Sequence, residues 1–105
     1  GSTPTLIFDE VDSGIGGGVA EIVGALLKQL GKRHQVMCVT HLPQVAAQAD
    51  AQWQVSKAAQ DGPTLSTIKA LANDERIEEI ARMLGGVTVT ATTRKHAAEM
   101  LGVAA

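Results

Sequence analysis

The sequence has very few aromatic residues, which make up only 2% of its 105 residues. Apolar residues of all kinds nevertheless amount to 45%, so a hydrophobic core has to be built from Val, Ile, Leu, Ala and Met. Such a composition is ordinary for α/β proteins. The chain length predicts a single domain or a piece of one.

The net charge is also small, and cysteine is scarce. The formal net charge is −2 and the basic residues are scattered, so we expect no nucleic-acid-binding surface within this segment. The single cysteine, Cys38, excludes an intramolecular disulfide and fits a reducing, cytoplasmic setting. Because Cys38 lies in an apolar run, we expect it in the core rather than at a nucleophilic site.

Long hydrophobic runs are missing as well. No run approaches the ~18 residues of a membrane span and no signal peptide is recognisable, so we expect a cytoplasmic protein that contacts no membrane. We interpret Gly1-Ser2 as an expression-tag scar (1–2), with native sequence over 3–105 that continues upstream.

Two apolar runs predict β-strands. The first covers Thr5 to Phe8 and the second Gln35 to Thr40, and both have the composition of strands that are buried on two faces. Between them, apolar residues recur at helical spacing from Val19 to Leu30. A helix that connects two such strands predicts a right-handed βαβ crossover and therefore a parallel pair.

The rest of the chain predicts a hairpin between helices. The hairpin strands alternate in polarity around the turn Gln60-Asp61-Gly62-Pro63. Asn73 or Asp74 is expected to cap the next helix, which stops at Gly85-Gly86. The predicted elements are a short helix over 43–49, strands over 52–57 and 64–71, and helices over about 73–84 and 91–101.

Each of the first two predicted strands ends in residues that can bind ligands. Asp9-Glu10 ends the first strand and Thr40-His41 ends the second, and parallel α/β sheets bind ligands at their carboxyl ends. One carboxylate there can hold Mg²⁺ through water while its neighbour orients or deprotonates a water molecule. A neutral histidine can hydrogen-bond that water or a phosphate oxygen. This layout indicates phosphoryl transfer.

Two loop motifs that also contain glycines or acids do not fit. A dinucleotide-binding loop that began at Gly14 would need its third glycine where Val19 stands, and the preceding acids would repel a pyrophosphate. An EF-hand loop that began at Asp9 would need alternating acids and a distal glutamate, which are missing.

Two hydrolase classes are also less consistent with the sequence. Asp12-Ser13-Gly14 resembles the catalytic triplet of homodimeric aspartic proteases, but those folds are all-β, which the helical periodicity contradicts. A serine hydrolase built on Ser13 and His41 would need a glycine where Val11 stands.

Three collinear motifs resemble the ABC and SMC class of ATPases. Leu6-Ile7-Phe8-Asp9-Glu10 resembles the Walker B strand, Val11 to Gly17 resembles the D-loop, and Val39-Thr40-His41 resembles the switch-histidine segment. From Thr5 to Leu101, the chain also closely resembles the C-terminal end of the RecN family of bacterial DNA-repair proteins. The residues that carry this likeness are DEVDSGIGG at 9–17, CVTHLPQVA at 38–46 and EIARMLGG at 79–86.

The resemblance implies a fold and a set of site residues. The fold would be the C-terminal half of a P-loop NTPase head of ABC/SMC type, α/β, with a mostly parallel sheet, flanking helices and a C-terminal β-hairpin. The cofactors would be ATP and Mg²⁺. Asp9 would hold Mg²⁺ through water, Glu10 would act as general base or water-orienting group, and His41 would contact the γ-phosphate or the attacking water. The D-loop, which in this class crosses a head-to-head dimer, would comprise Asp12, Ser13, Gly14, Ile15 and Gly16.

Motifs that the resembled class carries upstream are missing from this sequence. There is no G-x-x-x-x-G-K-[ST] loop, no Leu-Ser-Gly-Gly signature and no long heptad region. The resemblance therefore implies two ATPase partners, a Walker A lobe of the same parent chain and a second head, and we expect no ATP hydrolysis by the segment alone. It also implies that the parent protein contacts DNA, near the nucleoid, in recombinational repair of double-strand breaks. A non-catalytic interaction module remains the open alternative.

Overall fold

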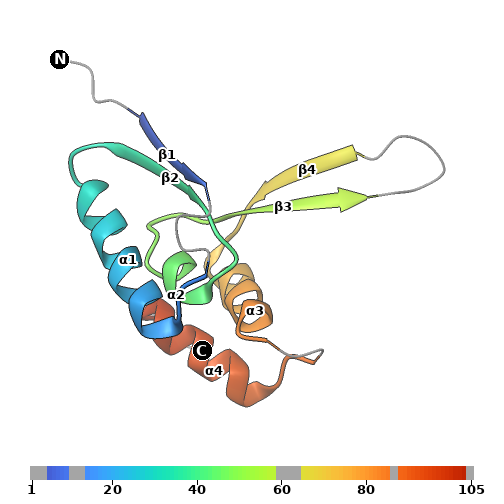
Figure 1. The fold of residues 1–105 in the computed structure, drawn as a ribbon. Helices are drawn as coiled ribbons and strands as arrows, with labels where there is room; N and C mark the ends of the chain where they lie inside the picture. The colour runs from blue at the N-terminus through green and yellow to red at the C-terminus, as the bar shows by residue number, and fades with distance from the viewer. Residues whose placement is uncertain (1–4, 10–13, 59–64, 86–87, 104–105) are drawn as a thin grey trace.

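The computed structural model describes residues 5–9, 14–58, 65–85 and 88–103. Figure 1 shows two strand pairs that extend away from a group of helices. The elements in chain order are β1 (Thr5–Asp9), α1 (Gly17–Leu30), β2 (Gln35–Val39), α2 (Pro43–Ala46), β3 (Trp53–Ala58), β4 (Leu65–Ala70), α3 (Asn73–Met83) and α4 (Ala91–Leu101).

The predicted βαβ unit is present at the start of the described chain. β1 and β2 pair in parallel, from Thr5 opposite Gln35 to Asp9 opposite Val39. The helix α1 connects them, as the helical spacing of its apolar residues predicts. The two strands therefore end at the same edge of the sheet, side by side.

The expectation that these strands are buried on both faces is wrong for the described structure. Ile7, Met37 and Val39 are 68%, 44% and 58% exposed, whereas the residues between them are half-buried. Side chains alternate across a strand, so these three share one face of the sheet. That face is exposed because no described element of the chain packs over it.

The predicted hairpin is also present. β3 and β4 pair antiparallel, with Trp53 opposite Ala70 and Val55 opposite Ile68. Its predicted turn, Gln60 to Pro63, lies outside the described residues. The described strands thus form one parallel and one antiparallel pair, each a separate two-stranded sheet.

The hairpin turns its polar face toward α3. Gln54 hydrogen-bonds to Glu79, and the cross-strand neighbour Lys69 forms an ion pair with Glu75. The opposite face carries Trp53, Val55 and Ile68, all exposed. The alternation that predicted the strands therefore places their apolar side away from the helices, the reverse of an ordinary half-buried hairpin.

The core lies among α2, α3 and α4. Ile80 and Ala81 of α3 are fully buried and pack with Ala46 of α2 and Ala97 of α4. α3 begins one residue earlier than a cap at Asn73 would allow, because Ala72 is the N-cap and its N–H donates to Glu75. Packing against α3 and α4 therefore holds α2 in place, and α2 begins just after the predicted switch segment.

Candidate functional site

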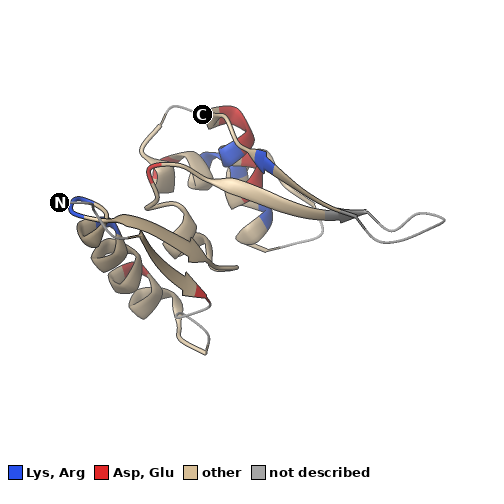
Figure 2. Cartoon of the chain, turned by 90° about the horizontal axis from the view of Figure 1, so that it is seen from above, with Lys and Arg blue, Asp and Glu red and all other residues tan. Residues whose placement is uncertain are grey.

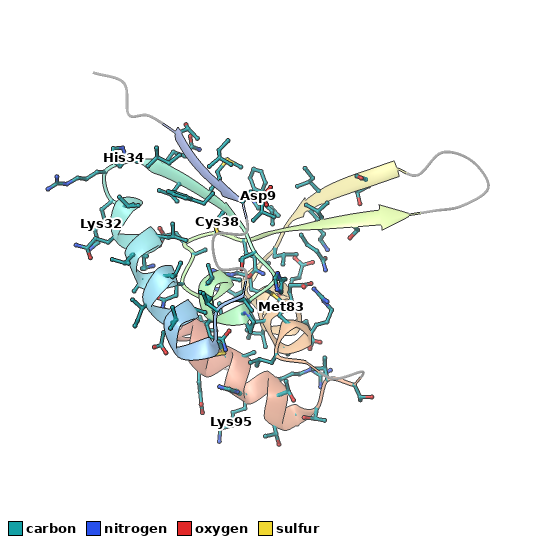
Figure 3. All side chains as sticks on the ribbon, in the orientation of Figure 1. Asp9, Lys32, His34, Cys38, Met83 and Lys95 are labelled. Atoms are coloured by element: carbon teal, nitrogen blue, oxygen red, sulfur yellow. The ribbon has the colours of Figure 1, made fainter. Side chains whose placement is uncertain are left out.

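The predicted site residues Asp9 and His41 lie at the same edge of the sheet. Asp9 is the last residue of β1, as Figure 3 shows, and pairs in register with Val39, the last residue of β2. Thr40 and His41 follow Val39 directly. Both Asp9 and His41 are exposed, so each side chain is accessible to a ligand at this edge.

Hydrogen bonds fix the turn that carries His41. The N–H of Leu42 donates to Thr40 Oγ1 at 3.0 Å, so this hydrogen bond links the two residues on either side of His41. Leu42 is the N-cap of α2, and its carbonyl accepts from the N–H groups of Val45 and Ala46, each at 3.1 Å. Pro43 occupies the first helical turn, where its missing N–H costs nothing. His41 is thereby held between the end of β2 and the start of α2.

The helix α2 is packed against α1 at a glycine. Gly24 of α1 is buried, and a β-carbon there would lie 3.0 Å from the carbonyl oxygen of Gln44 and 3.2 Å from Val45 Cα. Only glycine allows the two helix backbones to come this close without displacement. Gln48, just after α2, also donates to the carbonyl of Glu21 at 3.1 Å.

An ion pair supports the same contact from α1. Lys28 Nζ lies 2.9 Å from Asp50 Oδ1 and donates to the carbonyl of Gln48 at 3.1 Å. The hydrogen bond from Lys28 holds the pKa of the Asp50 carboxyl below its ordinary value of 3.8. Because both side chains are largely exposed, solvent screens this pair.

Arg76 of α3 holds α2 from the other side. Its Nη2 donates to the carbonyls of Ala46 and Ala49 at 3.2 and 3.0 Å, and its Nε donates to Gln52 Oε1 at 3.2 Å. The residue is 9% exposed, and this burial lowers the pKa of its guanidinium. The helical pattern of α3 indicates that Arg76 is buried, because Arg76 lies one turn before Ile80 on the apolar stripe of the helix.

The predicted D-loop is described only at its end. Gly14 has a φ of 80°, a conformation that favours glycine, Ile15 is half-buried, and Gly16 is the N-cap of α1. A β-carbon at Gly14 or Gly16 would meet no other atom of the described residues within 4 Å. The predicted site residues Glu10, Asp12 and Ser13 lie outside the described residues.

The described residues hold no group of three or more His, Cys, Asp or Glu side chains that could bind a metal ion. Mg²⁺ does not require such a group, since it commonly takes one or two carboxylates and completes its shell with water and phosphate oxygens. An exposed carboxylate at the end of a parallel strand, as Asp9 provides, fits that mode of binding. Among the same residues, no helix is long and apolar enough to cross a membrane.

The other charged residues cluster away from this edge. Figure 2 shows few charged residues on β1 and β2, whereas acidic and basic segments lie together around the helices near the C-terminus. Glu79 of α3 is buried and accepts from Arg82 Nε at 2.8 Å, and Glu78 forms an ion pair with Arg94 of α4. Glu78 and Glu79 thus bond to side chains of the same chain, which indicates a structural role.

A pocket of about 440 Å³ opens near the first turn of α1. Its wall includes Gly17 and Gly18 of α1, Gln44 of α2, and His96 and Met100 of α4. Sequence reasoning did not predict this pocket, since its walls come from segments that are distant in the sequence.

Comparison with known proteins gives consistent sequence matches. The chain is 54% identical over 100 residues to the DNA repair protein RecN of Xylella fastidiosa (strain 9a5c), covering 95% of this chain and 18% of that protein. It is 50% identical over 99 residues to RecN of Deinococcus radiodurans and 44% identical over 97 residues to RecN of Bacillus subtilis (strain 168), covering 94% and 92% of this chain. The chain spans 17–18% of the length of these relatives. No protein-family model matches the chain.

A solved structure has a similar fold. It is described as "Structural biochemistry of ATP-driven dimerization and DNA stimulated activation of SMC ATPases", and it superposes with a TM-score of 0.63 at 20% identity. The match covers 82% of this chain and 51% of that chain. The predicted resemblance to a segment of the RecN DNA repair proteins, with the α/β fold of an SMC ATPase head, is therefore confirmed.

Proposed function

We propose that this chain is the part of an ATPase head that supplies a Mg²⁺-binding carboxylate, a water-activating carboxylate and a phosphate-sensing histidine. The observation that carries the proposal is the parallel register of β1 and β2. It brings Asp9 and the Thr40-His41 turn to one edge of the sheet, where α/β proteins bind ligands.

Each side chain has a separate task in this proposal. Asp9 holds Mg²⁺ through water, and the ion when bound supplies positive charge that offsets the charge of the phosphates. Glu10, the next residue in the chain, orients the attacking water or accepts its proton. His41 hydrogen-bonds the γ-phosphate or that water, and the turn between β2 and α2 holds the imidazole at the edge.

The second part of the proposal is a head-to-head dimer that uses the D-loop, Asp12 to Gly16. The φ of 80° already favours glycine at position 14, but Gly16 has open space where a β-carbon would stand, so packing within the described chain does not explain its lack of a side chain. A backbone without side chains permits a second head to approach closely. The similar SMC structure is described in terms of ATP-driven dimerization.

The third part concerns the rest of the head. A Walker A lobe of the same parent protein would bind the phosphates and cover the exposed apolar faces, those of Ile7, Met37 and Val39 and of the hairpin. The similar SMC chain is about twice as long as the matched region, since the match covers 51% of it. Isolated apolar residues are common on protein surfaces, but here they gather on one side of each of two sheets. This arrangement favours the view that another lobe covers both faces.

The names of the relatives support the biological setting that we propose. RecN proteins are named for DNA repair, so we place the ATPase cycle in recombinational repair of double-strand breaks in the bacterial cytoplasm. DNA would be contacted by other parts of the parent protein, because this segment has a net charge of −2 and scattered basic residues.

His41→Ala in a full-length RecN that carries this segment tests the proposal. We expect the rate of ATP hydrolysis with Mg²⁺ and DNA to fall by about 10²-fold or more, as for loss of a positioned catalytic hydrogen-bonding group. His96→Ala is the matched control, since His96 is exposed on α4, and it should leave turnover unchanged. Turnover by His41→Ala at the wild-type rate, as in the control, would support the alternative, in which this segment is a non-catalytic interaction module.

A further inference from the structure

Arg76 is a buried cation whose hydrogen bonds go to uncharged acceptors. It is 9% exposed, and its guanidinium binds two backbone carbonyls and one side-chain amide. Burial of a charge is costly unless hydrogen bonds compensate it. The three acceptors around Arg76 therefore offset the cost of burying its charge.

All three acceptors lie in one segment that follows His41. Ala46 is the last residue of α2, Ala49 lies in the connection beyond it, and Gln52 precedes β3. The helix α2 has only four residues, far fewer than the roughly 12–15 that an isolated helix needs to be marginally stable. Its position must therefore be set by contacts from outside, and on the α3 side Arg76 adds hydrogen bonds to the packing of Ile80 and Ala81 against Ala46.

A short chain of hydrogen bonds leads from Arg76 to the turn around His41. Arg76 Nη2 binds the carbonyl of Ala46, the N–H of Ala46 binds the carbonyl of Leu42, and the N–H of Leu42 binds Thr40 Oγ1. His41 lies between these last two residues. A shift of α2 would therefore move the turn that presents the imidazole.

We propose that Arg76 is a positioning residue for His41, which acts by fixing α2 against α3. The proposal rests on the function proposed above for His41. A guanidinium suits the task because its fork of N–H groups reaches acceptors in several fixed directions, whereas a lysine ammonium offers one compact donor group. Arg82 on the same helix does not share this role, because it is largely exposed and binds Glu79.

The first experiment measures position without activity. In NMR spectra of the 105-residue chain, Arg76→Lys is expected to shift the amide signals of Thr40 and Leu42 and the imidazole signals of His41. Arg82→Lys, the matched change on the same helix, should leave those signals in place. If Arg76→Lys leaves them in place as well, the proposal is overturned.

A milder variant keeps the test decisive should Arg76→Lys fail to fold. Gln52→Ala removes the acceptor of Arg76 Nε and leaves both carbonyl bonds available. It should produce smaller shifts of the same His41 and Leu42 signals. The absence of any shift in folded Gln52→Ala would then contradict the proposal.

The second experiment measures ATP hydrolysis by full-length RecN that carries this segment. Arg76→Lys is expected to lower kcat by about 10- to 100-fold, as for a displacement of about 1 Å at a catalytic group, with the KM for ATP little changed. Arg82→Lys should retain the wild-type kcat.

The two proposals fail in different ways. If His41→Ala does not reduce turnover, the function proposed for His41 is wrong, and the NMR shifts alone then decide whether Arg76 positions the turn. If His41→Ala abolishes turnover but Arg76→Lys retains the wild-type kcat, the positioning role of Arg76 is refuted.

Discussion

Replacement of Gly24 by alanine tests the close contact between α1 and α2. This contact joins the helix that follows the predicted D-loop to the helix that follows His41. A β-carbon at position 24 would lie 3.0 Å from Gln44 O, 3.1 Å from Gln48 Cγ and 3.2 Å from Val45 Cα. Two of these three atoms belong to the backbone of the α2 segment, which cannot move aside as a flexible side-chain end can.

The net effect is the difference between two opposing contributions. Alanine in place of glycine in a helix interior stabilises by about 1 kcal/mol. Overpacking of a close contact costs about 1–3 kcal/mol, and the three short distances place Gly24→Ala well within that range. We expect a net loss of about 1 kcal/mol, which lowers the Tm of a chain of this size by about 4–8 °C.

Gly18→Ala is the matched control on the same helix. A β-carbon at Gly18 meets no atom within 4 Å in the part of the chain that the structure describes, so this change should leave the Tm equal or slightly raised. Thermal unfolding of both variants, followed by circular dichroism, measures the difference directly. A Gly24→Ala chain as stable as Gly18→Ala would refute the account of the α1–α2 contact.

Two further predictions concern the ion pair and the exposed apolar face. The hydrogen bond from Lys28 lowers the pKa of Asp50 below 3.8, so its stabilisation is present above that pH and is lost as the pH falls through the folded-state pKa. Lys28→Met should therefore flatten the acid side of the plot of Tm against pH, and an unchanged slope would contradict this. Trp53 is the only tryptophan and is exposed on the hairpin, so a separately produced Walker A lobe should shift its fluorescence to shorter wavelength. No shift under conditions of measured binding would show that the lobe does not cover this face.

Local periodicity predicted most of the elements correctly. The helical spacing from Val19 to Leu30 and the apolar run of β2 gave the parallel βαβ unit, and the alternation on either side of Gln60 gave the hairpin. These patterns succeed because each reflects a repeat of the backbone itself, 3.6 residues in a helix and two in a strand. The neighbouring positions of Asp9 and His41 followed from the same topology.

The pattern could not reveal what covers an apolar face. Ile7 and Met37 have the composition of buried strand residues, yet they are exposed in the described structure. Periodicity shows that a face is apolar, but burial also depends on which other segments pack against it. The hairpin gave the same result, because its polar residues Gln54 and Lys69 find partners on α3.

Residues that act through tertiary contacts were also missed. The role of Gly24 depends on the path of α2, and that of Arg76 depends on carbonyls 27 and 30 positions away in the sequence. Arg76 could have been noticed as a charged residue on an otherwise buried helical stripe. Its acceptors could not have been identified, because every residue has a backbone carbonyl and the sequence does not show which of them accepts from Arg76.

The central claim is that the adjacent acids Asp9 and Glu10 belong to a hydrolytic ATP site, and Glu10→Gln in full-length RecN that carries this segment tests it most directly. The measurement pairs ATP affinity with steady-state hydrolysis in the presence of Mg²⁺ and DNA. The account predicts that hydrolysis falls by about 10²- to 10⁴-fold while ATP still binds, because the amide cannot accept a proton from water. Hydrolysis at the wild-type rate by Glu10→Gln would contradict the account.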